Sequence, residues 1–223
     1  MSDDGLIQST PEERGCLLLA MRRAGVNDIG LLRAIETLPR ERFVPPRFQD
    51  LAHKNISLPI ACGQTMSRPV DLGRRLQALR VTKEHRVLEV GAGSAYATAL
   101  LAHLGRDIVS FERYQTLARS GQQRLREQGV TNANIICGDG LAISDLGSFD
   151  RILVNLALGD MPLTLQALLN PGGVLVFALS ASAPGCKKQQ LIKVTKSLLA
   201  GFVSEHIGVT RLTASCIGSS QTM

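Results

Sequence analysis

The sequence has 223 residues, of which 44% are hydrophobic and 20% are charged, so it is typical of a globular chain that is long enough to bury a core. Its formal net charge is +6, but the basic residues are scattered among acidic ones, and the absence of Trp with only 4% aromatic residues argues against a surface that stacks nucleic-acid bases. The five cysteines show no C-x-x-C spacing, which predicts reduced thiols and no metal site. The acidic start at Met1–Asp4 and the lack of an apolar run of membrane-spanning length predict a cytoplasmic protein with no membrane partner.

The first eighty residues carry helix signals. Thr10-Pro11-Glu12-Glu13 is a typical helix start, with Thr as the cap and Pro at the first position. Residues 49–69 show no long periodic pattern. Three helices are predicted here: Pro11–Ala24, Ile29–Leu38 and Asp71–Leu79. We therefore expect residues 1–80 to form a helical N-terminal cap.

From residue 81 onward, short apolar β-branched runs alternate with helix-forming segments. The predicted strands are Arg86–Val90, Asp107–Phe111, Ala133–Cys137, Phe149–Asn155, Val174–Leu179, Gln189–Ser197 and Ser204–Arg211. The predicted helices are Ala95–Leu104, Tyr114–Gln128 and Pro162–Leu169. This alternation predicts an α/β fold for residues 81–223, with a doubly wound, mostly parallel seven-stranded sheet and helices on both faces.

A glycine-rich loop follows the first predicted strand of this region. Gly91-Ala92-Gly93-Ser94 joins the strand Arg86–Val90 to a helix. Glycine tolerates positive φ angles and close approach to the backbone, and a helix N-terminus offers unpaired N–H groups. The loop therefore suits a nucleotide-like or carboxylate-bearing ligand, although Gly-x-Gly alone also fits a tight turn with no ligand.

Acidic residues stand at the ends of the next two strands in the chain. Glu112 lies 19 positions after Gly93 and is placed to accept hydrogen bonds from the hydroxyls of a ribose. Asp139, between two glycines, is placed to accept from an adenine amino group. Taken singly, Glu112 also fits a solvated carboxylate at a helix start, and Asp139 a turn residue. Since parallel strands end at one edge of the sheet, both are expected to line the same crevice.

The residue at position 96 separates two classes of adenosine cofactor. A nicotinamide dinucleotide needs a third glycine to seat its pyrophosphate, and Tyr96 stands at that position. S-adenosyl-L-methionine has no pyrophosphate, so a bulky residue is tolerable there. We therefore predict an S-adenosyl-L-methionine site. Its expected residues are Gly91, Ala92, Gly93, Ser94, Tyr96, Glu112, Asp139 and Gly140.

Several segments together resemble the protein-L-isoaspartate (D-aspartate) O-methyltransferase family, a class I S-adenosylmethionine-dependent methyltransferase family. The most specific segment is Leu58-Pro-Ile-Ala-Cys-Gly-Gln-Thr-Met-Ser-Arg-Pro69. The other matching segments are Pro39-Arg-Glu-Arg-Phe-Val-Pro45, Val87-Leu-Glu-Val-Gly-Ala-Gly-Ser94, Gly138-Asp-Gly140 and Leu168-Leu-Asn-Pro-Gly-Gly173. The resemblance extends from about Leu31 to Ile217.

The resemblance implies a repair methyltransferase. The expected reaction transfers a methyl group from S-adenosyl-L-methionine to the α-carboxylate of L-isoaspartyl residues in damaged proteins. It implies Ser67 as a catalytic residue, with Thr65 beside it as a donor to the carboxylate, and a substrate-binding segment within residues 1–80. Taken alone, Ser67 also fits a helix cap before Pro69. The expected partners are isoaspartyl peptides or proteins, with no nucleic acid, and the chain is expected to be a monomer or a weak oligomer.

Five positions depart from the pattern of the family. Ala61 and Cys62 stand where the family commonly has glycine and histidine, and Ala95 stands where it commonly has glycine. Val70 stands where the family commonly has an aromatic residue or histidine. Asn155 stands at the start of what is commonly a Thr-Ala-Ala-like run. Two alternatives therefore stay open: a divergent methyltransferase acting on another carboxylate or small molecule, and a non-catalytic S-adenosylmethionine-binding module.

Overall fold

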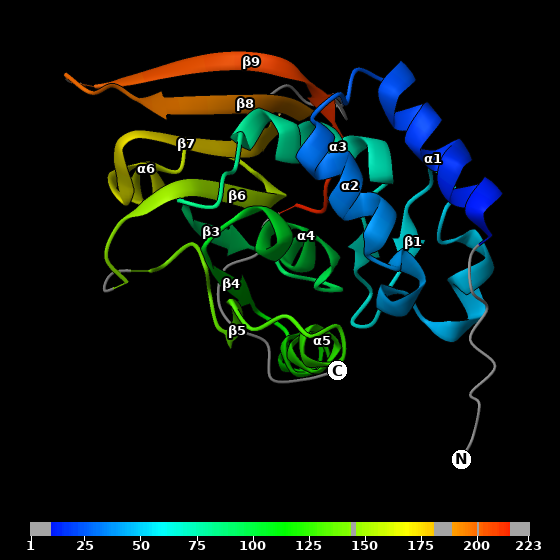
Figure 1. Ribbon diagram of the computed structural model, residues 1–223. Helices are drawn as coiled ribbons and strands as arrows, with labels where there is room; N and C mark the ends of the chain where they lie inside the picture. Colours follow the sequence, from blue (N-terminus) through cyan, green and yellow to red (C-terminus); the bar gives the residue numbers. More distant parts are fainter. Residues whose placement is uncertain (1–9, 144–145, 181–188, 200, 215–223) are drawn as a thin grey trace.

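The computed structural model describes residues 10–143, 146–180, 189–199 and 201–214. Its centre is a seven-stranded sheet in the order β5-β4-β3-β6-β7-β8-β9 (Figure 1). The strands are β3 (Arg86–Val90), β4 (Asp107–Glu112), β5 (Ala133–Cys137), β6 (Phe149–Leu158), β7 (Leu169–Ser180), β8 (Gln189–Lys196) and β9 (Phe202–Thr210). A separate pair, β1 (Leu58–Pro59) and β2 (Thr65–Met66), forms a small antiparallel sheet.

The sheet is mostly parallel, as predicted. β5, β4, β3, β6 and β7 pair in parallel, whereas β8 runs antiparallel to β7 and β9 antiparallel to β8. β4 and β5 lie on one side of β3, whereas β6 and the later strands lie on its other side, so the strand order reverses at β3. In such a sheet, the crevice for a ligand lies at the carboxyl ends of the strands beside the reversal.

Helices lie on both faces of the sheet, as predicted, and most of the helical residues gather on one of them. The helices are α1 (Pro11–Arg23), α2 (Ile29–Thr37), α3 (Pro69–Leu79), α4 (Tyr96–Leu104), α5 (Gln115–Glu127) and α6 (Leu163–Ala167), with the 3₁₀ helices η1 (Arg40–Phe43) and η2 (Pro46–Leu51). One hydrophobic cluster joins α1 to α5 to the sheet face that carries Val87 and Leu153. The other cluster joins Leu165 of α6 to the face that carries Leu88 and Val154.

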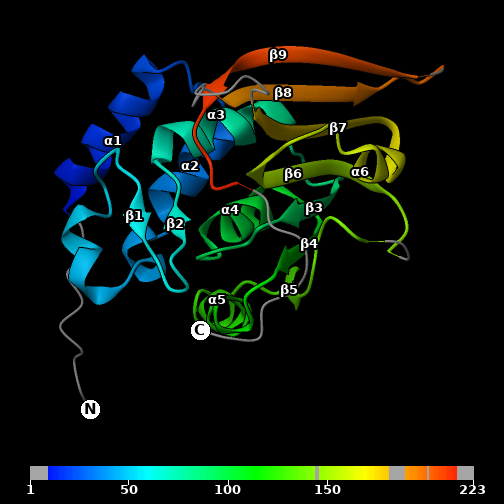
Figure 2. The same cartoon turned by 180° about the vertical axis from the view of Figure 1, so that it is seen from behind.

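The N-terminal helices share their core with the sheet domain. Met21, Leu31 and Leu76 belong to the same buried cluster as Leu100 of α4 and Ile108 of β4. In both views α1 lies at one end of the molecule, and α2 lies between α1 and α4 (Figures 1 and 2). A boundary near residue 80 between an N-terminal cap and a core remains a prediction.

The predicted cap of the first helix is confirmed. Thr10 and Glu13 form a reciprocal capping box, in which the Glu13 N–H donates to Thr10 Oγ1 (3.2 Å) and the Thr10 N–H donates to Glu13 Oε2 (3.0 Å). Asp28 caps α2 by accepting from the Leu31 N–H at 2.9 Å. These local signals fix where the first two helices begin.

One strand begins earlier than the sequence predicts. The predicted strand starts at Val174, whereas β7 already begins at Leu169 and includes Pro171, Gly172 and Gly173. Phe149 pairs with Leu169 and Arg151 with Val174, so the extra residues form a bulge within the strand. The φ angle of +75° at Gly172 permits that bulge. β6 also continues past Asn155 to Leu158, which places Asn155 within a strand.

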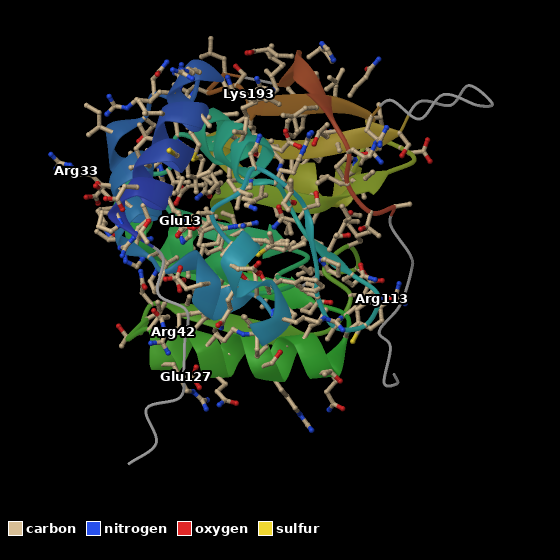
Figure 3. The ribbon with its side chains drawn as sticks, turned by 90° about the vertical axis from the view of Figure 1, so that its right-hand side faces the viewer. Glu13, Arg33, Arg42, Arg113, Glu127 and Lys193 are labelled. Carbon is tan, nitrogen blue, oxygen red and sulfur yellow. The ribbon has the colours of Figure 1, made fainter. Side chains whose placement is uncertain are left out.

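Charged side chains are spread over the surface. Figure 3 labels Glu13, Arg33, Arg42 and Glu127, which are all exposed and lie on different elements. Within the described residues, no helix combines the length and the apolar composition that crossing a membrane requires.

Candidate active site

A cleft lies where β3, β4 and β5 end and where β6 passes Asn155. All ten residues of the site predicted from the sequence line it. They are Thr65, Ser67, Gly91, Ala92, Gly93, Ser94, Tyr96, Glu112, Asp139 and Gly140. The predicted site is therefore one continuous surface, although the role of each residue remains a prediction.

The glycine loop is bound to the end of β4. The N–H groups of Gly91 and Ala92 both donate to the Phe111 carbonyl, at 2.8 and 3.0 Å. Gly91 and Gly93 have φ angles of +88° and +54°, which favour glycine. A β-carbon on Gly93 would meet only the tip of Ile60, at 3.5 Å, so the space in front of the loop is open to a ligand.

Glu112 is held rigidly beside this loop. Its side chain accepts from the Gly93 N–H at 2.8 Å through one oxygen and from the Tyr114 N–H at 3.0 Å through the other. The residue is buried but lines the cleft. Each carboxylate oxygen has a second lone pair, so Glu112 can accept two hydroxyl groups of a ribose without moving.

The β5 end forms the next part of the wall. Asp139 Oδ1 accepts from the Leu141 N–H at 2.9 Å, which is the geometry of a capped turn. Gly140 packs on the sheet, because a β-carbon there would lie 2.8 Å from both Phe111 Cβ and Val90 Cγ1. Glycine at 140 thus keeps this wall close to the strand ends.

Tyr96 connects the glycine loop to the N-terminal region. Its ring packs edge-on against Phe43 with 5.4 Å between centroids, and the Arg40 guanidinium lies 5.8 Å from its centre. Burial raises the pKa of the Tyr96 hydroxyl, so it stays neutral. In addition to lining the cleft, Tyr96 therefore anchors η1 to the start of α4.

The segment between β1 and α3 forms the opposite wall. Thr65 is exposed on β2, and Ser67 is half-buried just before α3. Gln64 Nε2 reaches the Tyr114 hydroxyl at 3.5 Å, which joins this wall to the one that carries Glu112. Arg113, labelled in Figure 3 beside the start of α5, also lines the cleft.

Two arginines outside the predicted site contact Ser67. Arg40 Nη2 donates to the Ser67 carbonyl at 3.1 Å, and its Nη1 donates to the Ala52 carbonyl. Arg75 Nη2 donates to Ser67 Oγ at 2.8 Å. Both side chains are buried, and desolvation lowers each guanidinium pKa to about 10, so both remain charged at neutral pH.

The sequence contains a signal for Arg75. Leu72 and Leu79 lie three and four positions from it, and this spacing puts Arg75 on the buried, apolar face of α3. A charged residue on the buried face of a helix is uncommon and points to a functional or paired group. Glu89, an acidic residue inside the apolar strand β3, carries the same kind of signal.

Of the five departures from the family pattern, Asn155 is the one that lines the cleft. It bonds three groups: it accepts from Arg75 at 2.6 Å and donates to Glu89 at 2.7 Å and to the Gly91 carbonyl at 3.2 Å. Val70 is buried in the first turn of α3, and its N–H donates to Asn55 Oδ1 at 3.1 Å.

Two of the departures occupy positive-φ positions. Cys62 has φ +57° and Ala95 has φ +70°. The Ala95 methyl fits because the residue facing it on α5 is Gly121, where a β-carbon would lie 3.1 Å from Ala95 Cβ. Ala61, the remaining departure, is exposed in the turn after β1.

The chain's C-terminal part also reaches the site. After β9, the chain returns to β6, where the Ala157 N–H donates to the Thr213 carbonyl at 2.8 Å. Thr213 and Ala214 line the cleft. The sequence held no motif that would have predicted this return.

The cleft fits an adenosine-bearing cofactor of the kind predicted. One wall has open space before Gly93 and a fixed carboxylate at Glu112, whereas the other wall carries hydroxyl groups. This combination can hold the ribose of S-adenosylmethionine on one side and a second, polar substrate on the other.

Comparison with known sequences points to one family. A sequence model of the protein-L-isoaspartate(D-aspartate) O-methyltransferase family matches residues 12–210. Protein-L-isoaspartate O-methyltransferase 2 of Rhodopseudomonas palustris is 42% identical over 187 residues, which cover 83% of this chain and 85% of the relative. Protein-L-isoaspartate O-methyltransferase of Xanthobacter autotrophicus is 43% identical over 200 residues, covering 89% and 86%.

Solved structures give the same fold. One protein-L-isoaspartate O-methyltransferase superposes with a TM-score of 0.79 at 22% identity, covering 91% of this chain and 66% of that chain. A beta-aspartate methyltransferase structure from Plasmodium falciparum, in complex with S-adenosyl-L-homocysteine, gives 0.76 at 20% identity, covering 90% and 97%. At 20–22% sequence identity, these structural similarities support the fold of this chain.

Proposed function

Because this chain belongs to the protein-L-isoaspartate(D-aspartate) O-methyltransferase family, we propose that it transfers a methyl group from S-adenosyl-L-methionine to the α-carboxylate of L-isoaspartyl residues in proteins. One observation carries the assignment to this site. The Thr65–Ser67 segment and the glycine loop with Glu112 face the same cleft from opposite walls. That arrangement brings a carboxylate-binding surface next to a cofactor-binding surface.

The reaction depends on the positioning of the carboxylate against the methyl group more than on acid–base catalysis. S-adenosyl-L-methionine, when bound, supplies an electrophilic methyl group. The attacking carboxylate is already ionised at neutral pH, so no side chain has to remove a proton. The chain must hold one carboxylate oxygen in line with the methyl group and keep water away.

The hydroxyls on the substrate wall suit this task. We assign Ser67 as the catalytic residue that donates to the carboxylate, with Thr65 as a second donor. A hydroxyl is a neutral donor, so it holds the carboxylate through a hydrogen bond and leaves the attacking oxygen nucleophilic. A directly paired cation would hold the same oxygen more tightly and reduce its nucleophilicity.

On the cofactor wall, we assign Glu112 to the ribose hydroxyls and Asp139 to the adenine amino group. Gly91, Ala92, Gly93 and Ser94 provide a backbone surface that a ligand can approach closely. Tyr96 and Gly140 support that surface by packing. These roles are proposals that rest on the position of each residue in the cleft.

Methyl transfer to a synthetic peptide tests the proposal. The purified chain is mixed with radiolabelled S-adenosyl-L-methionine and a short isoaspartyl peptide, with the matching aspartyl peptide as the control. We expect base-labile label on the isoaspartyl peptide alone, and a reduction of about 100-fold or more in Ser67→Ala. Cofactor binding without label on the peptide would contradict the proposed substrate, and the departures at Asn155 and Val70 would then be the first positions to revert.

A further inference from the structure

Arg75 is a fully buried cation on the cleft side of α3. It lies on the apolar face of the helix, between Leu72 and Leu76. Burying a charge costs several kcal/mol unless hydrogen bonds and an opposite charge compensate for it. The contacts of Arg75 therefore need an explanation beyond packing.

The guanidinium joins two side chains that come from different parts of the chain. Its Nη2 donates to Ser67 Oγ at 2.8 Å, and its Nη1 donates to Asn155 Oδ1 at 2.6 Å. Asn155 in turn donates to Glu89 Oε1 at 2.7 Å. An amide can accept and donate at the same time, so Asn155 links the cation to the buried carboxyl without direct contact between them.

This chain of hydrogen bonds has a direction. Glu89 accepts from Asn155, Asn155 accepts from Arg75, and Arg75 donates to Ser67. A guanidinium has no acceptor, so the Ser67 hydroxyl cannot donate back to it. The Ser67 proton is thus free to point away from Arg75, and the residue lines the cleft.

The main chain of Ser67 is fixed separately. Arg40 Nη2 donates to the Ser67 carbonyl at 3.1 Å. The backbone position therefore depends on η1, whereas the hydroxyl direction depends on α3 and β6. Arg75 is the group that contacts the hydroxyl itself.

We propose that Arg75 is a positioning residue that holds the Ser67 hydroxyl as a donor directed at the substrate carboxylate. The Ser67 hydroxyl separates the Arg75 charge from the substrate carboxylate, so Arg75 attracts the anion without pairing with the attacking oxygen. The inference rests on the proposed function, since it assumes that a carboxylate is the group bound at Ser67.

Binding of the peptide measures this role without requiring turnover. The dissociation constant of the isoaspartyl peptide is measured by calorimetry in the presence of S-adenosyl-L-homocysteine. We expect Arg75→Met to weaken peptide binding about 10- to 100-fold, as expected when a hydrogen bond assisted by charge is lost. Binding of S-adenosyl-L-homocysteine itself should change less than about twofold, and KM for the peptide should rise more than kcat falls.

The same substitution in a Ser67→Ala background distinguishes positioning from a structural role. If Arg75 acts through Ser67, Arg75→Met should weaken peptide binding less than about threefold once the hydroxyl is absent. An equal loss in both backgrounds would overturn the inference. Arg74→Met is the matched control, because Arg74 is the neighbouring, exposed arginine of the same helix.

A second variant tests whether Arg75→Met weakens binding only because it disturbs the fold. Arg75→Met leaves the Glu89 carboxyl without its nearby positive charge, whereas R75M/E89Q removes both ionisable groups together. We expect the double variant to bind the peptide as weakly as Arg75→Met alone. Recovery of wild-type binding would show that Arg75 only balances the charge of Glu89, which would overturn the assignment.

The wild-type chain separates the two proposals. If it methylates the isoaspartyl peptide but Arg75→Met binds that peptide normally, only the role of Arg75 is wrong. If the wild-type chain neither binds nor methylates the peptide, the proposed function is wrong, and the role of Arg75 fails with it.

Discussion

At the scale of single residues, Glu89 combines complete burial with several donors. Its carboxyl accepts from Thr98 and Ser110 at 2.6 Å each and from Asn155 at 2.7 Å. Burial nevertheless raises its pKa from 4.5 to about 7, because desolvation outweighs these hydrogen bonds and the nearby Arg75. The native state thus keeps the proton to a higher pH than the unfolded chain does.

This difference predicts a pH dependence of stability. The contribution of Glu89 to the free energy of unfolding is fully present below about pH 4.5, and it is lost as the pH rises through about 7. The free energy of unfolding of the wild type, measured with urea, should therefore fall relative to that of Glu89→Gln across this window. Glu127→Gln, which removes a carboxylate from the exposed end of α5, should not reproduce the effect. A constant gap between wild type and Glu89→Gln from pH 4.5 to 7.5 would contradict the shift.

The sequence predicted residues that stand in recognisable motifs better than residues that act through long-range contacts. Gly93, Glu112 and Ser67 follow from strand ends and from a family motif, and all three line the cleft. Arg75 belongs to no motif, and Glu89 lies in a family segment that gives no sign of its hydrogen-bond partner. Both side chains bond to Asn155, which lies 80 positions after Arg75 and 66 positions after Glu89. Local patterns hold no information about such pairings.

At the scale of elements, the turn between β1 and β2 carries backbone strain. Cys62 and Gly63 have consecutive positive φ angles of +57° and +64°, and the Gln64 N–H donates to the Ala61 carbonyl at 3.2 Å. Type I′ turns also have two positive φ angles and prefer Asn-Gly there. Cys62 has a β-carbon that is unfavourable in this conformation.

Replacing that cysteine should stabilise the protein. We expect Cys62→Asn to raise the free energy of unfolding by about 0.5–1 kcal/mol, because Asn tolerates the left-handed region better. Cys62→Ala keeps the unfavourable β-carbon and should show no gain, which makes it the control. Chemical denaturation of the two variants measures the difference, and equal stability would refute the strain argument.

Elements were predictable where a local signal was strong. The capping box at Thr10 and the apolar run of β3 gave bounds close to those observed. β1 and β2 have two residues each, which is too short for any periodic pattern. The Pro171–Gly173 bulge was missed because the same residues favour a turn, and only pairing with β6 keeps them in a strand.

At the scale of the whole molecule, one core spans the chain. Leu17 and Met21 near the N-terminus belong to the same buried cluster as Leu100 and Leu191. The alternation of strands and helices predicted the sheet. It could not predict that α1 to α3 pack on α4 and the sheet, since those contacts join distant segments.

The shared core predicts a single unfolding transition. Calorimetry of the full chain should give equal calorimetric and van't Hoff enthalpies, because the N-terminal helices cannot unfold without exposing α4. A chain that begins at residue 81 should lack cooperative unfolding, because it exposes the face of α4 that those helices cover. Two resolved transitions in the full chain would instead favour independent units.

The double attachment of Ser67 has an entropic consequence. Arg40 fixes its main chain and Arg75 fixes its hydroxyl in the folded protein, before any substrate arrives. Rotational freedom of that hydroxyl is therefore lost during folding and does not have to be lost again on binding. A weakly bound peptide then meets a prearranged donor, so even a short and flexible substrate can be aligned through one carboxylate.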